Sequence, residues 1–359
     1  MAVLNVGAKR VQGTNAERIA TSLTPAGSVA GWKELGRTKL TSSSGNYGVT
    51  GLDNKRYLMV LVNNINAGQV EGDSLRFNND TTSNQHAGRY NSNGGSDGTI
   101  TNKTKTNMFG FHPHTQPSFA VMNVANYTSK EKLAIIHAIG QHTNSSGSGN
   151  PPSRAECVAK YVNTSDPISS IQMVTGWSTF SSGSEMVVLG YDPADTNTAS
   201  FWEELASVEL SSAGSELSSG TFTAKKYLWI QAYVKGDGSS TPNLRVQVNG
   251  DTGSNYAERQ SSNGGSDGTG ASQDHFPASN GGKFGNFSNM FVINNASNEK
   301  LFIVHGVSVD TSGAGTAPVR REIAGKWANT SNQITSIKIY KSTGGNYQSG
   351  SVIKVWGSD

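Results

Sequence analysis

The chain has 359 residues, of which 34% are hydrophobic and 15% charged, with 42 glycines and a formal net charge of +3. This composition favours short strands joined by turns over helices, and the length allows two domains that each bury a core. No run of Lys or Arg is dense enough to follow a phosphate backbone and no stretch approaches the roughly 18 apolar residues of a membrane span, so neither nucleic acid nor a membrane is an expected partner.

An identical octapeptide marks two related halves of the chain. Residues 92–99 read Ser-Asn-Gly-Gly-Ser-Asp-Gly-Thr, and residues 262–269 repeat them without a change. A repeat at this distance predicts a duplicated domain. We therefore expect an N-terminal arm at 1–28, a first repeat at 29–192, a linker at 193–199 and a second repeat at 200–359. The single cysteine, Cys157, excludes an intrachain disulfide, so strand pairing and burial must stabilise both repeats.

The arm, residues 1–28, stands outside the duplication and ends in a turn-rich segment. It is predicted either to tie one subunit to another or to pack locally as a terminus. Residues 1–10 lack the continuous apolar core of a secretory signal, so we expect synthesis in a cytoplasm without a leader.

Strand-like segments follow one another in each repeat. Residues 57–62 and 227–234 are rich in β-branched and aromatic residues, whereas 74–78 and 243–249 alternate between apolar and polar side chains. Further strands are predicted at 119–124, 132–139, 168–171 and 184–190, with counterparts at 290–293, 300–307, 334–339 and 351–357. About eight strands per repeat predict an all-β fold of two tandem antiparallel β-sandwiches, jelly-roll-like, with an immunoglobulin-like sandwich as the alternative.

The octapeptide motif places Asn93 and Asp97 in the first repeat and Asn263 and Asp267 in the second. Glycine and asparagine tolerate positive φ angles, so the motif is predicted to be a turn that shapes the sandwich. The alternative is that the motif forms a contact with a partner.

Two histidines, His137 and His305, occupy equivalent positions in equivalent predicted strands. Since no nucleophile or acid is spaced to serve them, they are predicted to be structural residues at a sheet face. His112 and His114 form a His-x-His pair that could bind a metal, but the second repeat has no such pair and an exposed loop is the favoured interpretation.

Each repeat also carries an Arg-x-Glu pair, Arg154 with Glu156 and Arg320 with Glu322, followed four residues later by Lys160 and Lys326. Residues two apart in a strand project from one face. Such a set could anchor an acidic sugar or form an ion-pair network inside the sandwich, and the network is the favoured interpretation.

Calcium is the one cofactor for which the sequence offers candidate ligands, because Asp80, Asp97, Asp251 and Asp267 lie in oxygen-rich loops. The closing bidentate glutamate of a calcium loop is missing, and Asx-turns explain these loops equally well. We therefore predict no cofactor and keep calcium as an alternative.

Five segments of the second repeat belong together in this respect: residues 249–259, 262–269, 313–322, 326–330 and 355–359. In combination they resemble virion-associated structural proteins of marine tailed phages. The first repeat departs from the pattern at 151–156 and 189–192, so the two repeats are not expected to meet the same partner. The resemblance implies a structural component of a particle.

The function expected from these observations is that of a non-enzymatic phage structural protein located in the virion, as a capsid decoration or an appendage. It would assemble with itself and with other virion proteins through its loops and arm. Three alternatives remain open. A carbohydrate-binding fibre module would bind a surface glycan through the divergent loops 101–117 and 271–286, a double-jelly-roll major capsid protein would form shells, and a glycan-cleaving enzyme would need paired carboxylates.

Overall fold

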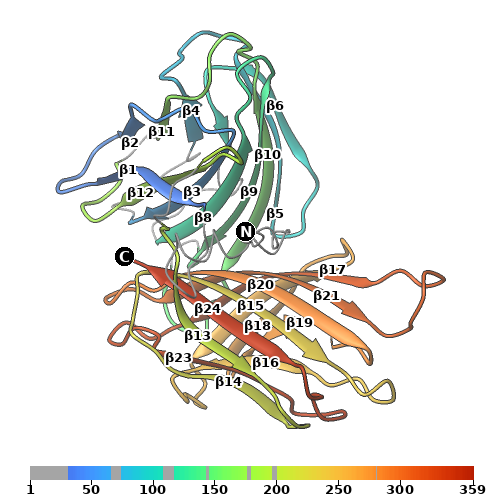
Figure 1. Ribbon diagram of the computed structural model, residues 1–359. Helices are drawn as coiled ribbons and strands as arrows, with labels where there is room; N and C mark the ends of the chain where they lie inside the picture. The colour runs from blue at the N-terminus through green and yellow to red at the C-terminus, as the bar shows by residue number, and fades with distance from the viewer. Residues whose placement is uncertain are drawn as a thin grey trace, which may run out of the picture.

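The computed structural model describes residues 31–65, 74–107, 117–142, 145–175, 179–195, 200–279 and 281–359. These residues form 24 β-strands and no helix (Figure 1). All pairings between the strands are antiparallel. The predicted fold, two tandem antiparallel β-sandwiches of jelly-roll-like form, is confirmed. The predicted arm at 1–28 lies outside the described residues.

Each repeat pairs an eight-stranded sheet with a four-stranded sheet. In the first repeat the large sheet has the order β1-β12-β3-β8-β9-β10-β5-β6 and the small sheet the order β2-β11-β4-β7. The strands are β1 (Lys33–Lys39), β2 (Asn46–Thr50), β3 (Tyr57–Asn64), β4 (Ser74–Phe77), β5 (His86–Ser92), β6 (Gly98–Lys103), β7 (Thr106–Asn107), β8 (Ser118–Ala125), β9 (Lys132–Gly140), β10 (Ser153–Tyr161), β11 (Ser170–Val174) and β12 (Glu185–Tyr191).

The second repeat has the same strand order in both sheets, β13-β24-β15-β20-β21-β22-β17-β18 and β14-β23-β16-β19. Its strands are β13 (Glu203–Glu209), β14 (Glu216–Thr221), β15 (Tyr227–Lys235), β16 (Leu244–Val248), β17 (Tyr256–Ser262), β18 (Gly268–Gln273), β19 (Phe276–Ser279), β20 (Gly285–Ile293), β21 (Lys300–Val309), β22 (Val319–Trp327), β23 (Ser336–Tyr340) and β24 (Val352–Ser358). The identical topology agrees with the duplication read from the octapeptides.

Each repeat thus has twelve strands among its described residues, where the sequence predicts about eight. The strands of the first repeat that were not predicted include β2, β5, β6 and the two-residue β7. Strand β6 shows the reason, because it lies at the edge of its sheet and most of its side chains are polar and exposed. Such a strand lacks the apolar residues that make strands recognisable in a sequence.

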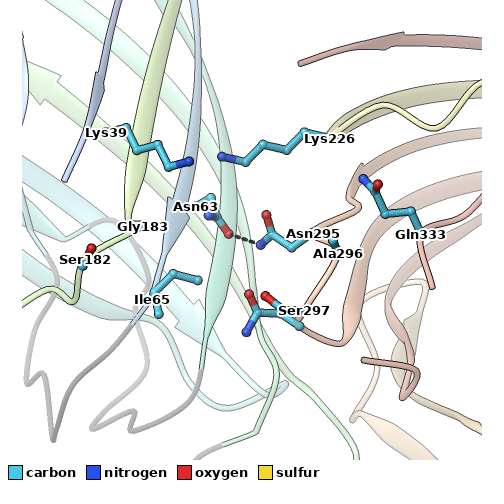
Figure 2. A pocket seen from close by; sticks show the side chains of 11 residues that line it. Lys39, Asn63, Ile65, Ser182, Gly183, Lys226, Asn295, Ala296, Ser297 and Gln333 are labelled. Carbon is cyan, nitrogen blue, oxygen red and sulfur yellow. Dashed lines mark hydrogen bonds between the residues drawn. The ribbon is translucent and has the colours of Figure 1, made fainter. Parts of the chain in front are cut away.

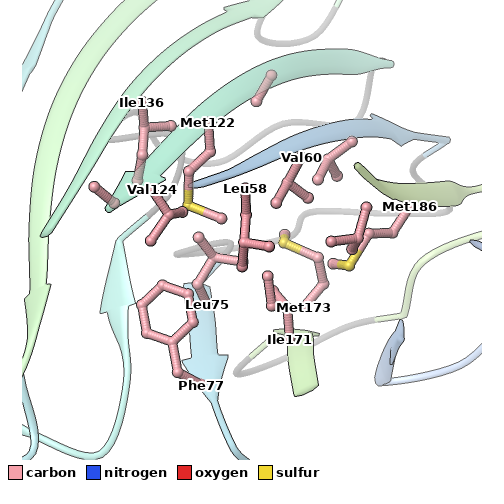
Figure 3. Packing of buried hydrophobic residues seen from close by; sticks show 14 of the residues in the cluster. Leu58, Val60, Leu75, Phe77, Met122, Val124, Ile136, Ile171, Met173 and Met186 are labelled. Carbon is pink, nitrogen blue, oxygen red and sulfur yellow. The ribbon is translucent and has the colours of Figure 1, made fainter. Parts of the chain in front are cut away.

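The core of each sandwich lies between its large and small sheets. In the first repeat Leu58 and Val60 of β3 pack with Leu75 of β4 and Met173 of β11, as Figure 3 shows. A separate cluster of the same kind fills the second sandwich. Burying each such side chain contributes about 1.5–3 kcal/mol, so each repeat has its own apolar core.

A third apolar cluster joins the two repeats. Strand β3 sends Leu58, Val60 and Val62 into its own sandwich, whereas Met59 and Leu61 point the other way and pack with residues of the second repeat. Both faces of β3 are therefore buried, which explains its continuous apolar sequence. The two large sheets lie against each other, with the small sheets on the outside (Figure 1).

The octapeptide forms the same tight turn in both repeats. Asn93 and Gly94 have φ angles of 52° and 70°, and Asn263 and Gly264 have φ angles of 52° and 76°. Two successive positive φ angles characterise a type I′ hairpin turn, for which Asn-Gly is the preferred pair. The turns connect β5 with β6 and β17 with β18.

Between the repeats, Asp192 accepts hydrogen bonds from Arg56, and Asp195 forms an ion pair with Lys55. The last strand of the first repeat ends at Tyr191 and the first strand of the second begins at Glu203. The limits of the linker at 193–199 stay a prediction, because residues 196–199 lie outside the described part of the chain.

Candidate functional site

The titratable residues singled out from the sequence meet between the two large sheets. His137 on β9 and His305 on β21 are equivalent residues, and their ring centroids lie 4.1 Å apart. Two equivalent residues, one from each repeat, thus meet directly at this point. The cavity beside the two rings has a volume of about 10 Å³, which is room for one water molecule.

Strand register brings the Arg-x-Glu pairs to this place. Glu156 lies opposite His137 in the β9–β10 ladder, and Arg154 lies opposite Ile139. In the second repeat Glu322 lies opposite His305 in the β21–β22 ladder. Since cross-strand neighbours share one face of a sheet, each His and Glu point together toward the other repeat.

Arg154 is the centre of the charged network. Its Nη2 and Nε donate to the two carboxylate oxygens of Asp267 at 2.8 and 3.4 Å. Its Nη1 donates to Glu156 Oε1 at 2.5 Å and lies 3.5 Å from Glu322 Oε2. With only 9% of its side chain exposed, Arg154 crosses from one repeat to the other and pairs there with the carboxylates of Asp267 and Glu322.

The counterpart of Arg154 has a different environment. Arg320 is 59% exposed and pairs with Glu322 of its own repeat at 3.2 Å. Asp97, the counterpart of Asp267, is 49% exposed and pairs with Arg89 at 3.4 Å. The link between an arginine and the octapeptide aspartate of the other repeat is therefore formed in one direction and not in the other.

These positions correct one expectation from the sequence. The network of Arg154, Glu156, Arg320 and Glu322 was expected inside each sandwich, but it lies on the outer faces of the large sheets, where the repeats meet. The two asparagines of the motif support it from the backbone side. Asn93 Oδ1 accepts the amide of Arg154 at 2.9 Å, and Asn263 does the same for Arg320 at 2.9 Å.

Burial shifts the titration of this cluster. Burial, opposed by Arg154 and assisted by Glu322, raises the pKa of Glu156 to about 7. Burial also lowers the pKa of His137 to about 4 and that of His305 to about 3. Both imidazoles are therefore neutral at neutral pH, and the positive charge of the cluster resides on the arginines.

A metal-like arrangement exists within this cluster. Glu156, His305 and Glu322 each offer one ligand atom, and these atoms lie within 4.8 Å of one another. The guanidinium of Arg154 already bonds one of these carboxylates and lies close to the other. A divalent cation would have to displace Arg154, so the arrangement as it stands is an ion-pair network.

The four aspartates considered for calcium each receive protein donors. Asp80 accepts from the Thr82 amide at 2.8 Å and from the Tyr161 hydroxyl at 3.0 Å, while Asp97 and Asp267 bind arginines as described. Asp251 accepts from the Gly253 amide at 2.8 Å and from Trp327 Nε1 at 2.7 Å. Asp80 and Asp251 thus sit in Asx-turn arrangements. His112 and His114 lie outside the described residues.

A second buried ion pair lies where the repeats meet, and its carboxylate is Glu299, a residue that the sequence analysis did not consider, in place of Glu322. Lys326 Nζ is 2.9 Å from Glu299 Oε2, with side chains 0% and 2% exposed, and it also donates to the Gln141 carbonyl of the first repeat at 3.0 Å. The equivalent pair, Lys160 with Glu131, is 43% and 42% exposed. No local sequence signal distinguishes the two pairs, because burial depends on which surface of each repeat is covered.

A polar pocket of about 350 Å³ opens at another point between the repeats (Figure 2). Lys39 and Asn63 line it from the first repeat, and Lys226, Asn295 and Gln333 from the second. Asn295 Nδ2 donates to Asn63 Oδ1 at 2.9 Å. Lys226 also pairs with the buried Glu185 at 3.0 Å. The pocket presents ammonium groups and side-chain amides, which suit a polar or acidic ligand.

No protein-family model matches the chain, and no curated protein matches it. Among solved structures it is similar to domains LG4-5 of the mouse laminin alpha1 chain, with 11% identity over 92% of this chain and 90% of that one and a TM-score of 0.19. It is also similar to the LG1-3 region of the laminin alpha2 chain, with 8% identity over 87% and 64% and a TM-score of 0.19. At these TM-scores the likeness identifies neither a family nor a function. No helix long and apolar enough to cross a membrane occurs in the described ranges.

Proposed function

We propose that this chain is a non-enzymatic structural protein of a phage particle, either a capsid decoration or a virion appendage. One observation carries the proposal: a charged cluster is buried where the repeats meet, whereas large apolar side chains are exposed on the surface. The ionisable cluster around Arg154 joins the two repeats beside a cavity with room for about one water molecule, and Arg154 is nearly buried there. Large apolar side chains such as Leu133 and Ile135, in contrast, stand exposed on an open sheet face.

This distribution supports an assembly protein. An acid–base pair that works on a substrate needs space for the reacting group within hydrogen-bond reach, and a contiguous exposed apolar surface is typical of a protein–protein contact. The resemblance of residues 249–259, 313–322 and 355–359 to virion proteins of marine tailed phages points in the same direction.

Mass spectrometry of the particles tests the proposal. Particles of the phage that encodes the chain are purified on a density gradient, and its peptides are quantified against those of the major shell protein. We expect a fixed stoichiometry that persists after a high-salt wash. A protein abundant in the infected-cell lysate and missing from the washed particles would overturn the proposal.

A carbohydrate-binding module is the second candidate, and the polar pocket between the repeats favours it. Side-chain amides such as those of Asn295 and Gln333 hydrogen-bond sugar hydroxyls, and Lys39 could bind an acidic group. A glycan array probed with the intact chain and with Asn295→Ala and Gln333→Ala variants tests this candidate. Binding that both substitutions abolish would support it, whereas an array without any signal would reject it.

A further inference from the structure

Two apolar surfaces of the large sheets are exposed in the part of the chain that the structure describes. The first-repeat face consists of Leu133, Ile135 and Val158, which are 56%, 54% and 50% exposed. A surface concavity of about 500 Å³ is lined by these three side chains and their neighbours. The second-repeat face consists of Tyr233, Phe287 and Val307, which are 43%, 40% and 37% exposed and are adjacent in the β15–β20–β21 ladder.

The counterparts of both faces are buried in the contact between the repeats. Leu133, Ile135 and Val158 correspond to Leu301, Ile303 and Ala324, which are only 1%, 6% and 2% exposed. Phe287 and Val307 correspond to Phe119 and Ile139, which are 1% and 0% exposed. Phe119 and Ile139 of the first repeat belong to one apolar cluster with Leu301 and Ile303 of the second. Within the chain, the counterpart of the second-repeat face thus already packs against the counterpart of the first-repeat face.

We propose that another molecule of this chain covers these surfaces, with the second-repeat face of one molecule docking on the first-repeat face of the next. The contact would reproduce, between molecules, the contact that joins the repeats within a molecule. This inference deepens the proposed function, on which it rests, by naming the surface through which the protein assembles. Because each molecule offers one face of each kind, the assembly is head-to-tail and forms a closed ring or a linear chain.

Charge complementarity supports this occupant. Within the molecule, Arg154 lies beside Ile139 and binds Asp267 across the contact at 2.8 Å. The equivalent arginine, Arg320, lies beside Val307 of the second-repeat face and is 59% exposed. The equivalent aspartate, Asp97, pairs with Arg89, which lies opposite Val158 of the first-repeat face. Docking in the proposed register brings Arg320 of one molecule toward Asp97 of the next.

Light scattering on the full chain over a range of concentrations tests the proposal. We expect a mass that rises with concentration to a multiple of the monomer. Ile135→Glu on the first-repeat face and Phe287→Glu on the second-repeat face should each yield a folded monomer, because each places a charge in an apolar contact. Thr50→Glu, an exposed position on β2 of the small sheet, is the matched control and should leave the multimer intact.

Mixing the two variants separates a head-to-tail contact from a symmetric one. The Ile135→Glu variant retains its second-repeat face and the Phe287→Glu variant retains its first-repeat face, so an equimolar mixture should form dimers and nothing larger. A contact between two identical faces would instead leave one of the two variants multimeric by itself, and mixing would add no new species. Asp97→Arg and Arg320→Asp should each weaken association, and the chain that carries both substitutions should recover it.

A wild-type chain that stays monomeric at every concentration overturns the proposal. Association that begins only when residues 1–30 are removed also overturns it, because those residues would then cover the face within the molecule. The two proposals fail separately. A monomer that is present in washed particles leaves the proposed function standing, whereas a head-to-tail multimer that is missing from them refutes only the virion role.

Discussion

The outer surfaces of the two large sheets have closely related sequences and opposite environments. Leu133 is 56% exposed in the first repeat, whereas its counterpart Leu301 is 1% exposed in the second. At the other end of the strands the order reverses, since Phe119 is buried and Phe287 is exposed. The two repeats are not related by a two-fold axis at their contact, so each buries a different part of the same sheet face. Equivalent residues therefore make unequal contributions to stability, and paired substitutions can measure the difference.

The largest difference is expected for the buried lysine. Lys326→Ala leaves Glu299 buried without its partner and should lower the free energy of unfolding by about 3–5 kcal/mol. Lys160→Ala removes the exposed counterpart and should change it by less than about 1 kcal/mol. Urea unfolding of both variants measures the difference between the two free energies of unfolding, provided that the dependence on urea concentration (the m-value) is the same. Equal losses of free energy of unfolding would show that Lys160 is as buried as Lys326.

A slightly smaller difference is expected for the two arginines. Arg154→Ala removes the donor that binds Asp267 and Glu156, and the loss should lie near the lower end of about 3–5 kcal/mol, because part of Glu156 stays hydrated. Arg320→Ala, at an exposed position, should cost less than about 1 kcal/mol in the monomeric Phe287→Glu background. Differential scanning calorimetry of the matched pair provides the measurement. An Arg154→Ala loss no larger than that of Arg320→Ala would contradict the proposed role of Arg154 as the link between the repeats.

For the apolar pair, Leu301→Ala should cost about 2 kcal/mol, at the low end for a buried leucine because a contact between two sheets can partly close the cavity. Leu133→Ala should cost less than about 0.5 kcal/mol for an isolated molecule. Thermal unfolding at low protein concentration tests this contrast. The same measurement at high protein concentration adds a second test. If Leu133→Ala lowers the stability only of the multimer, Leu133 lies in the intermolecular contact.

The last expected effect concerns pH, where the shifted pKa values of the two histidines and of Glu156 act in opposite directions and partly cancel. Burial holds the pKa of His137 near 4 and that of His305 near 3, below the value of about 6.5 in an unfolded chain. Between those values the unfolded state binds more protons, so the histidine contribution to stability is present above about pH 6.5 and is lost as the pH falls. Burial raises the pKa of Glu156 to about 7, so between about pH 4.5 and 7 the folded state binds more protons than the unfolded state. In this window the Glu156 contribution to stability therefore increases as the pH falls.

Melting temperatures measured from pH 8 to pH 4 test this expectation. The other charged groups that face the two rings are Arg154, Arg320 and Glu322. The doubly substituted His137→Gln and His305→Gln chain should lose less stability on acidification than the wild type. A double variant whose profile is as steep as that of the wild type would show that other groups dominate the acid response.

Short-range patterns in the sequence were sufficient for most of the strands and for the duplication. The alternation and β-branched content of β3 and β4 identify them as strands, and two positive φ angles at Asn93 and Gly94 are what an Asn-Gly pair favours. Polar edge strands such as β6 were missed because their partners, and not their own side chains, hold them in the sheet.

The two identical octapeptides show what a sequence cannot decide alone. Asp97 and Asp267 have the same neighbours in sequence, yet Asp267 binds the nearly buried Arg154 across the contact between the repeats while Asp97 stays half exposed. Local propensity and hydrophobic pattern act within a few residues, so the sequence by itself determined most of the strands, the turn and the two equivalent sandwiches. Only the tertiary structure decided which of two equivalent faces became a contact between the repeats and which remained open, because that choice depends on the packing of residues far apart in the chain.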